Sequence, residues 1–240
     1  MGELTVSAPD LPLGVLRASL RRRGYLLLRG GMEPAAMLRT RRALLSLDRG
    51  HTWVTPCGAV VPGRRPADIK KAALLNPANY RKLMALPEIE AIPRDERLRR
   101  FLVRLFPAPF TTPHLYLLRV VVPDDLRSAT PPHQDVAYIS ELLRYRCWIP
   151  LGSCSRRVGG LAVMEGSHVI HGTLPTRRDP DAYLNVLRSD IEGLRFPWMT
   201  ASYQAGDVLV FSNHLVHAAL PNVTPDLLRL SVEFSLMFES

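Results

Sequence analysis

Apolar residues recur at helical spacing in two segments near the start of the chain. Residues 12–23 (PLGVLRASLRRR) carry apolar side chains on one side and arginines on the other, and Gly24 ends the pattern. A second run follows Pro34, a residue that suits the first turn of a helix because its missing N–H has no partner there. Between the two runs, residues 25–30 (YLLLRG) form a short apolar stretch that ends in glycine. The pattern predicts a helix, a buried strand and a second helix.

The next two segments differ in regularity. Residues 51–80 mix glycine, proline and polar residues without a period, which predicts a long loop of the kind that often forms a lid or a substrate wall. Residues 81–106 return to helical spacing and are rich in Leu, Arg and Glu, with Pro87 and Pro93 dividing them. We therefore expect further, interrupted helices after an irregular loop.

A strand-like pattern begins after Pro113. The apolar runs become short, rich in β-branched and aromatic residues, and separated by Gly, Pro, Asn or Ser. In order they read HLYLLRVVV, VAYI, YRCWIPL, LAVM, DVLVF and LSVEFSLMF. Roughly residues 111–240 are therefore expected to form an all-β barrel or jelly roll that the helices of the first half cover. Because 240 residues suit one such unit, we expect a single domain over residues 1–240, mainly β with flanking helices.

The charge of the chain changes this picture little. A net charge of +9 and a pI of about 10.0 raise nucleic acid as a partner. Only Lys70, Lys71 and Lys82 are lysines, so 28 of the 31 basic residues are arginines, a bias that GC-rich coding produces by itself. No nucleic-acid-reading motif surrounds the densest cluster, at residues 21–23. We expect a small-molecule substrate and no nucleic acid.

Cysteine content and hydropathy bear on where the protein works. Three cysteines without zinc-site spacing suggest neither a disulfide framework nor a thiolate cage. The first residues lack the basic start and apolar stretch of a secretion signal, and no apolar run approaches the ~18 residues of a membrane span. We expect a cytoplasmic protein without a membrane partner; the oligomeric state does not follow from the sequence.

The segment PPHQDVAYI holds the first candidate for chemistry. His133 and Asp135 are two positions apart on a predicted strand, so their side chains should leave the same face while Gln134 points to the other. Two metal-ligand types would then point to one place. Alone the pair is weak evidence, because His-x-Asp also arises by chance and function must be argued from a whole site.

A second segment, AGDVLVFSNHLVHAALPNVTPDLLRLSVEF, supplies further histidines followed by an arginine on a later strand. Two neutral imidazoles and one carboxylate on one face of Fe(II) leave three positions open, as a bidentate co-substrate and O₂ require. His214 and His217 are both candidates for the third ligand.

Together these segments resemble the phytanoyl-CoA dioxygenase-like (PhyH) branch of the Fe(II)- and 2-oxoglutarate-dependent oxygenases, over almost the whole chain. PPHQDVAYI is similar to the first metal motif of that family, YRCWIPLGSCSRRVGGLAVMEGSHVIHG to its strand and hairpin, and GDVLVFSNHLVHAALPN to its second metal motif. In the second motif an Asn follows the ligand histidine five residues later, and Asn222 has that place relative to His217. The resemblance implies a double-stranded β-helix (jelly roll, cupin-like) with Fe(II) held by His133, Asp135 and His217.

The resemblance also implies where 2-oxoglutarate binds. Arg229 and Ser231 follow His217 at the family's distance, in the Arg-x-Ser pattern of many relatives, and alternation places both on one face of a strand. A planar guanidinium suits the distal carboxylate of the co-substrate, although a lone arginine in a strand more often extends to solvent. Trp148, in WIPL, matches a family position close to the co-substrate. The strand HLYLLRVVVP lacks the Gln and Lys that many relatives carry there.

The implied reaction is hydroxylation, desaturation or oxidative ring closure with consumption of 2-oxoglutarate and O₂. Asp135 favours these outcomes, because relatives that halogenate replace this carboxylate with a small residue. We expect a secondary-metabolite substrate, as in antibiotic biosynthesis, and a saccharide-containing one is a lead because Trp53, Tyr80 and Trp198 could stack on sugar faces. Two alternatives stay open, a metal-dependent jelly-roll enzyme that does not use 2-oxoglutarate and a non-catalytic barrel that binds small molecules.

Overall fold

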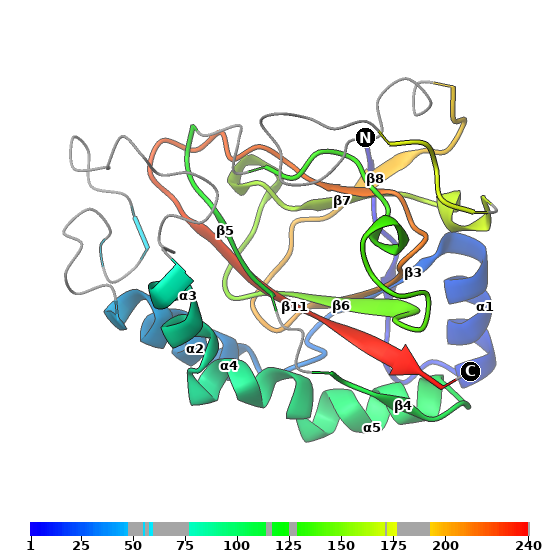
Figure 1. Ribbon diagram of the computed structural model, residues 1–240, viewed down its shortest axis with the longest axis horizontal. Helices are drawn as coiled ribbons and strands as arrows, with labels where there is room; N and C mark the ends of the chain where they lie inside the picture. The colour runs from blue at the N-terminus through cyan, green and yellow to red at the C-terminus, as the bar shows by residue number, and fades with distance from the viewer. Residues whose placement is uncertain are drawn as a thin grey trace.

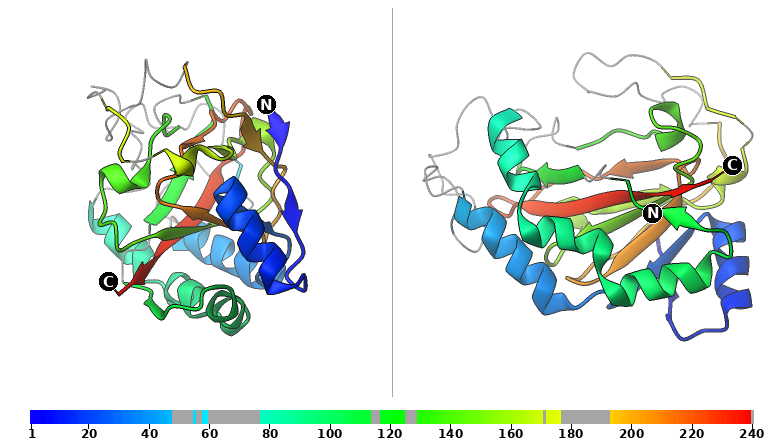
Figure 2. Two further views of the ribbon diagram at one scale, coloured as in Figure 1. Left: turned by 90° about the vertical axis from the view of Figure 1, so that its right-hand side faces the viewer. Right: turned by 60° about the horizontal axis from the view of Figure 1, so that its bottom comes forward.

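Two β-sheets lie at the centre of the molecule, and helices cover the outer face of the larger one (Figures 1 and 2). A computed structural model of the chain describes residues 1–47, 55, 58–59, 77–113, 117–124, 129–170, 172–176 and 193–239. The mainly β fold with flanking helices that the sequence predicts is confirmed. The prediction that residues 1–240 form one domain stays a prediction.

The larger sheet has seven strands in the order β2-β3-β9-β6-β11-β4, with β5 also paired to β11. All pairs are antiparallel except β2 with β3. The strands are β2 (Val6–Ser7), β3 (Tyr25–Leu28), β4 (Phe110–Thr111), β5 (Leu117–Val121), β6 (Tyr145–Pro150), β9 (Val208–Ser212) and β11 (Arg229–Phe238).

The smaller sheet has four strands in the order β1-β8-β7-β10. They are β1 (Gly2–Glu3), β8 (Trp198–Thr200), β7 (Leu161–Met164) and β10 (His217–Ala219). Strands from the first 28 residues thus join both sheets, ahead of the β-rich part of the sequence.

Strict alternation along β11 separates the two faces of the large sheet. Leu230, Val232, Phe234 and Leu236 belong to the apolar core under the helices. The residues between them are polar and also buried, namely Arg229, Ser231, Glu233 and Ser235. Because successive side chains of a strand point to opposite faces, all four polar side chains face the interior between the sheets. One strand therefore supplies both the core and a polar inner wall.

Helices of the described part of the chain pack along the larger sheet (Figure 2). They are α1 (Leu13–Arg23), α2 (Pro34–Leu47), α3 (Pro77–Met84), α4 (Pro87–Ala91) and α5 (Glu96–Leu105). Gly24 ends α1 in the left-handed conformation at φ 83°, and the Asp95 side chain caps α5 by accepting a hydrogen bond from the Leu98 N–H at 2.8 Å. The predicted breaks are confirmed, since Pro87 starts α4 and Pro93 lies in a 3-10 turn.

One predicted strand is wrong. VAYI, residues 136–139, does not extend, because the N–H groups of Tyr138 and Ile139 both donate to the Asp135 carbonyl and close a 3-10 turn over Asp135–Ala137. β-branched and aromatic residues favour strands only weakly, and these local hydrogen bonds win. The expected loop over residues 51–80 lies largely outside the described residues, and its last four residues are helical as the start of α3 (Pro77–Met84).

Gly159 is a glycine that the fold requires. Its φ is 90°, and a Cβ there would meet the Leu220 carbonyl oxygen at 2.6 Å. We expect Gly159→Ala to lower the free energy of unfolding by about 2 kcal/mol or more, because the left-handed strain and the backbone contact add. Gly14→Ala in α1 is the control, since its Cβ meets nothing within 4 Å and alanine favours a helix. Chemical denaturation of both variants tests this, and equal stability would contradict it.

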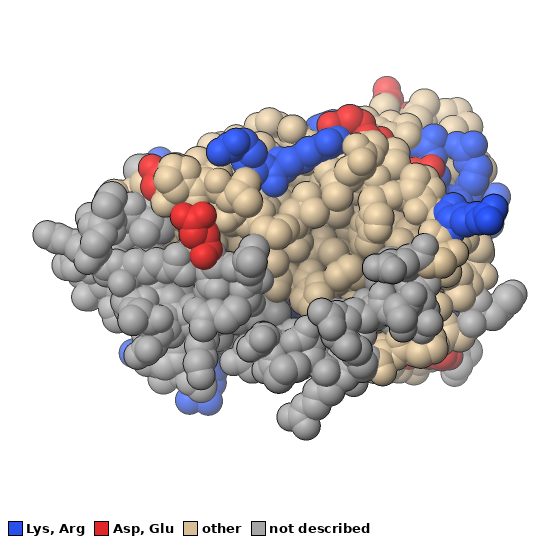
Figure 3. Space-filling model, turned by 90° about the horizontal axis from the view of Figure 1, so that it is seen from above, with Lys and Arg blue, Asp and Glu red and all other residues tan. Residues whose placement is uncertain are grey.

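One face of the molecule is hollowed near its middle (Figure 3). Where this face is described, the basic side chains form separate groups, with acidic side chains beside several of them. In the described ranges, no helix is long and apolar enough to cross a membrane.

Candidate functional site

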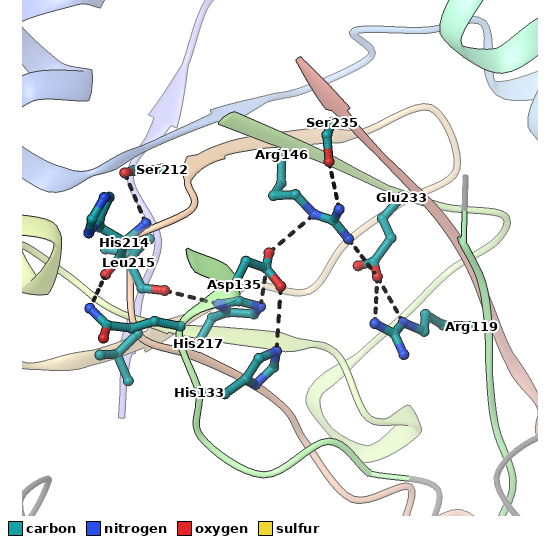
Figure 4. Close-up of polar contacts among 12 residues, drawn as sticks. Arg119, His133, Asp135, Arg146, Ser212, His214, Leu215, His217, Glu233 and Ser235 are labelled. Carbon is teal, nitrogen blue, oxygen red and sulfur yellow. Dashed lines mark hydrogen bonds and ion pairs between the residues drawn. The ribbon is translucent and has the colours of Figure 1, made fainter. Parts of the chain in front are cut away.

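Three metal-ligating side chains meet in the interior between the two sheets. Ligand atoms of His133, Asp135 and His217 all lie within 4.8 Å of one another, and all three residues are buried. The Asp135 carboxylate lies 3.8 Å from Nε2 of each histidine, through Oδ1 to His133 and through Oδ2 to His217. The structure therefore brings together the three residues that the sequence predicts as ligands (Figure 4).

Backbone pairing brings the two histidines together. His133 and His217 form an isolated antiparallel bridge, in which each backbone N–H donates to the carbonyl of the other at 3.0 Å. Gln134 is extended, with φ −113° and ψ 134°, so Asp135 returns to the face of His133 before the 3-10 turn begins. The shared face is thus confirmed, but a single bridge and a turn produce it where the sequence suggested a strand.

The Gln134 side chain points away from the ligands and holds the segment of His133 and Asp135 in place through two hydrogen bonds. Its Nε2 donates to the His214 carbonyl at 2.7 Å, and its Oε1 accepts from the Leu174 N–H at 2.8 Å. His214 therefore contributes its backbone to this support, and among the described residues its ring is not part of the cluster. Of the two candidates for the third ligand, the structure places His217 in the cluster.

The protonation states suit a divalent cation. Nδ1 of His133 lies 2.8 Å from the Pro131 carbonyl, and Nδ1 of His217 lies 3.0 Å from the Leu215 carbonyl. A carbonyl can only accept, so each Nδ1 carries the proton and each Nε2 lone pair faces the cluster. Burial, followed by the neighbouring His217, lowers the pKa of His133 to about 3, which keeps its ring neutral.

The carboxylate of Asp135 stays ionised although it is buried. Burial alone would raise the pKa of Asp135, but the charge of Arg146, with Nε 3.1 Å from Oδ2, lowers it below its ordinary value. Two neutral imidazoles and one carboxylate are the donor set of non-haem Fe(II) sites. Donors on one face of an ion at about 2.1 Å lie about 3 Å apart, so the 3.8 Å contacts leave room for an ion among the three side chains and would shorten around it.

Arg229 does not extend to solvent, because only 3% of it is exposed. Its Nη1 donates to Ser231 Oγ at 2.9 Å, its Cζ lies 5.8 Å from the centroid of the Trp148 ring, and its Nε has no partner. It forms no ion pair with an acidic residue in the described part of the chain. Burial lowers the pKa of this guanidinium. Among the described residues no carboxylate pairs with it, so Arg229 offers a buried cationic group to a ligand. The three residues predicted for the co-substrate lie together.

Asn222 connects the two halves of the site. Its Nδ2 donates to the Leu227 carbonyl at 2.6 Å, and its Oδ1 accepts from the Thr224 hydroxyl at 2.6 Å. These bonds organise the loop between the strand of His217 and the strand of Arg229. The family position that distinguished His217 from His214 thus has a structural explanation.

The sequence reasoning missed Arg146, Glu233 and Arg119. All three lie on the inner face of the large sheet beside the ligands, and two ion pairs join them (Figure 4). A signal was present, because a charged residue at an inward position of an otherwise apolar strand is rarely buried without a partner.

The sequence was compared with known families and structures. Residues 20–230 match the family model for phytanoyl-CoA dioxygenase (PhyH). The chain belongs to this family. Membership confirms the resemblance drawn from the metal motifs, and the PhyH match takes in five of the six residues predicted for the site, with Ser231 directly after its end.

Individual relatives of the PhyH chain share less of the sequence. It is 33% identical over 114 residues to a 1-deoxypentalenic acid 11-beta-hydroxylase of Streptomyces exfoliatus, a match that covers 43% of this chain and 39% of that protein. The chain thus spans about two fifths of the length of this relative.

Two solved structures share the fold. One is the non-heme alpha ketoglutarate dependent carbocyclase SnoK from nogalamycin biosynthesis, with a TM-score of 0.64, 18% identity, and coverage of 98% of this chain and 87% of that one. The other is the epimerase SnoN in complex with Fe3+, alpha ketoglutarate and nogalamycin RO, with a TM-score of 0.64, 20% identity, and coverage of 94% and 83%. At these identities they establish the jelly-roll fold alone.

Proposed function

We propose that this PhyH chain is an Fe(II)- and 2-oxoglutarate-dependent oxygenase, with His133, Asp135 and His217 as the iron ligands. The observation that carries the proposal is the buried cluster itself, in which the ligand atoms of two histidines and one aspartate lie within 4.8 Å of one another. A buried carboxylate is costly unless a cation balances its charge, and the two inward-facing Nε2 atoms can bind the same cation. Family membership supports iron as that cation.

Arg229, Ser231 and Trp148 bind the co-substrate in this proposal. The guanidinium is buried and lacks a counter-ion in the described structure, so a carboxylate from a ligand would satisfy it. Ser231 already orients one guanidinium nitrogen, and the Trp148 ring closes one side of the space. The Trp148 Nε1, which is buried and without a partner, is a further donor available there.

Iron, 2-oxoglutarate and O₂ together supply an oxidant that removes hydrogen from an unactivated carbon, while 2-oxoglutarate is converted to succinate and CO₂. The chain contributes placement and a dry interior. The two histidines keep fixed tautomers through backbone carbonyls, and the bridge between them holds their separation. Burial of all three ligands excludes water that would otherwise intercept the oxidant.

Anaerobic titration tests this function without knowledge of the substrate. Fe(II) and 2-oxoglutarate added under argon should produce the visible charge-transfer band of a chelated 2-oxo acid, and admission of O₂ should then release succinate. Fe(II) binding without the band would favour a metal-dependent enzyme that does not use 2-oxoglutarate. Retention of a small-molecule ligand after removal of all metal would favour a binding barrel. Either result overturns the proposal.

For the substrate we infer a small molecule of secondary metabolism that is hydroxylated or closed into a ring. The similarity to a 1-deoxypentalenic acid 11-beta-hydroxylase and to two enzymes of nogalamycin biosynthesis supports this class. The saccharide lead rests on Trp53 and Tyr80, whose side chains lie outside the described residues, and on Trp198, which packs beside a small cluster around Met164 and Val216. Succinate release measured with and without candidate glycosides and 1-deoxypentalenic acid tests it, since a true substrate accelerates the release.

We also propose that the enzyme works in the cytoplasm. Cys147 and Cys154, the cysteines that the structure describes, are buried free thiols. A reducing compartment keeps such thiols reduced and iron in the ferrous state. Fractionation of cells that express the tagged protein tests the compartment, and recovery outside the cytoplasmic fraction would contradict it.

A further inference from the structure

Arg146 has an unusual set of contacts for a residue on the inner face of β6. Its Nε lies 3.1 Å from Asp135 Oδ2, its Nη2 lies 2.9 Å from Glu233 Oε1, and its Nη1 donates to Ser235 Oγ at 2.6 Å (Figure 4). Each nitrogen of the guanidinium therefore meets a different side chain. Only 3% of this arginine is exposed.

Glu233 extends the contacts away from the ligands. Its Oε1 also accepts from Arg119, at 2.8 Å from Nε and 2.7 Å from Nη2. Arg119, Glu233, Arg146 and Asp135 thus form a row of alternating charges, which we call the charge row. It runs from a side chain that is 33% exposed to one that is 10% exposed.

The charge row has no net charge, which explains how it can be buried. An isolated charge in the interior is costly, whereas partners on both sides offset much of the desolvation. Arg146 by itself would also repel a cation at Asp135. Because Glu233 neutralises Arg146 from the far side, Arg146 can contact the ligand carboxylate and still leave the site able to attract a metal.

We propose that Arg146 is a positioning residue for Asp135, and that Glu233 and Ser235 hold Arg146 in place. This inference rests on the proposed function, because it assigns Asp135 as a metal ligand. The carboxylate of an aspartate can rotate, and contact with Oδ2 restricts that rotation before the metal arrives. With one oxygen engaged, the carboxylate occupies one position on the ion and leaves the others for the co-substrate and O₂.

A purely structural role is the competing explanation. Arg146 and Ser235 are direct partners in the register of β6 and β11, so their bond could serve only to join the two strands. The contact with Asp135 is an ion pair outside hydrogen-bond geometry, so the other two contacts must hold the guanidinium against the carboxylate. A lysine keeps the charge and one bond but cannot reach three partners, which distinguishes the two roles.

The test is anaerobic Co(II) titration of Arg146→Lys, followed by the visible spectrum of the bound metal. We expect the affinity for Co(II) to fall about 10- to 100-fold, the usual effect of losing a partner of a ligand. We also expect the spectrum to change, because a released carboxylate can bind through both oxygens. Cys147→Ala is the matched control, since Cys147 is the next residue of β6 and its side chain lies in the core on the opposite face.

Two milder variants keep the inference testable if Arg146→Lys does not fold. Ser235→Ala removes one support and should weaken Co(II) binding about threefold to tenfold, the scale of one ordinary hydrogen bond. Glu233→Gln removes the negative charge that pairs with Arg146 on the side away from Asp135, and it should weaken Co(II) binding further. If Arg146 acts through these supports, combining Arg146→Lys with Glu233→Gln should cost less than the sum of the two.

The outcomes separate this inference from the proposed function. If the unmodified protein binds no Co(II), the metal centre is wrong and the inference falls with it. If the unmodified protein binds Co(II) and the variants match it in affinity and spectrum, while their unfolding temperatures fall as in Cys147→Ala, Arg146 is structural and only this inference is overturned.

Discussion

The His217→Ala protein is expected to lose Fe(II) affinity by more than about 100-fold, since loss of a mere partner of a ligand already costs about 10- to 100-fold. His217 supplies one of three donor atoms, and apart from His133 no other histidine in the described part of the chain belongs to the cluster. Equilibrium dialysis of Fe(II) under argon measures this directly. The apo protein should stay folded, because the backbone bridge to His133 does not need the imidazole ring.

His214→Ala is the matched comparison for His217→Ala. His214 lies three residues earlier, and its support of Gln134 comes from its backbone carbonyl, which alanine retains. Its Fe(II) affinity should remain within about threefold of the unmodified protein, well below the effect of a lost partner. Full metal binding by His217→Ala together with loss in His214→Ala would reverse the choice of ligand.

Arg229→Met should have opposite effects on ligand binding and on stability. Removal of the guanidinium should lower 2-oxoglutarate affinity by about 100-fold or more, since each charge-assisted hydrogen bond contributes about 1.5 to 3 kcal/mol. The protein without co-substrate should become more stable by about 1 kcal/mol or more, because an uncompensated buried charge is replaced by an apolar side chain of similar size.

Calorimetric titration of 2-oxoglutarate and thermal unfolding of the apo protein measure the two effects of Arg229→Met. Arg156→Met is the control, since Arg156 pairs with Glu3 at the surface and should change neither quantity appreciably. A large loss of apo stability with unchanged co-substrate affinity would make Arg229 a structural residue.

Local features of this fold could be predicted from the sequence because local chemistry determines them. Gly24 ends a helix through its positive φ, and Pro87 begins one where its missing N–H has no cost. The alternation of LSVEFSLMF predicts a strand with two different faces, and β11 has them. The spacing of His133 and Asp135 likewise predicts a shared face, which depends only on the extended conformation of Gln134.

Features that depend on distant pairing could not be predicted in the same way. The charge row requires that β6 and β11 lie side by side in a register that places Ser235 opposite Arg146. A sequence shows that Arg146 and Glu233 are out of place in apolar strands, but it does not show that they meet. The bridge between His133 and His217 is also a single long-range contact. Only the family resemblance indicated in advance that these two histidines would meet.

The alternation along β11 also constrains how this chain can change. Deleting one residue near the start of the strand would shift every later position to the opposite face. Leucine, valine and phenylalanine would then line the site, and serine and glutamate would enter the core beneath the helices. Substitutions in β11 can thus be accepted one at a time, but insertions and deletions cannot, so diversity in length is expected in the loops that flank this strand and not within it.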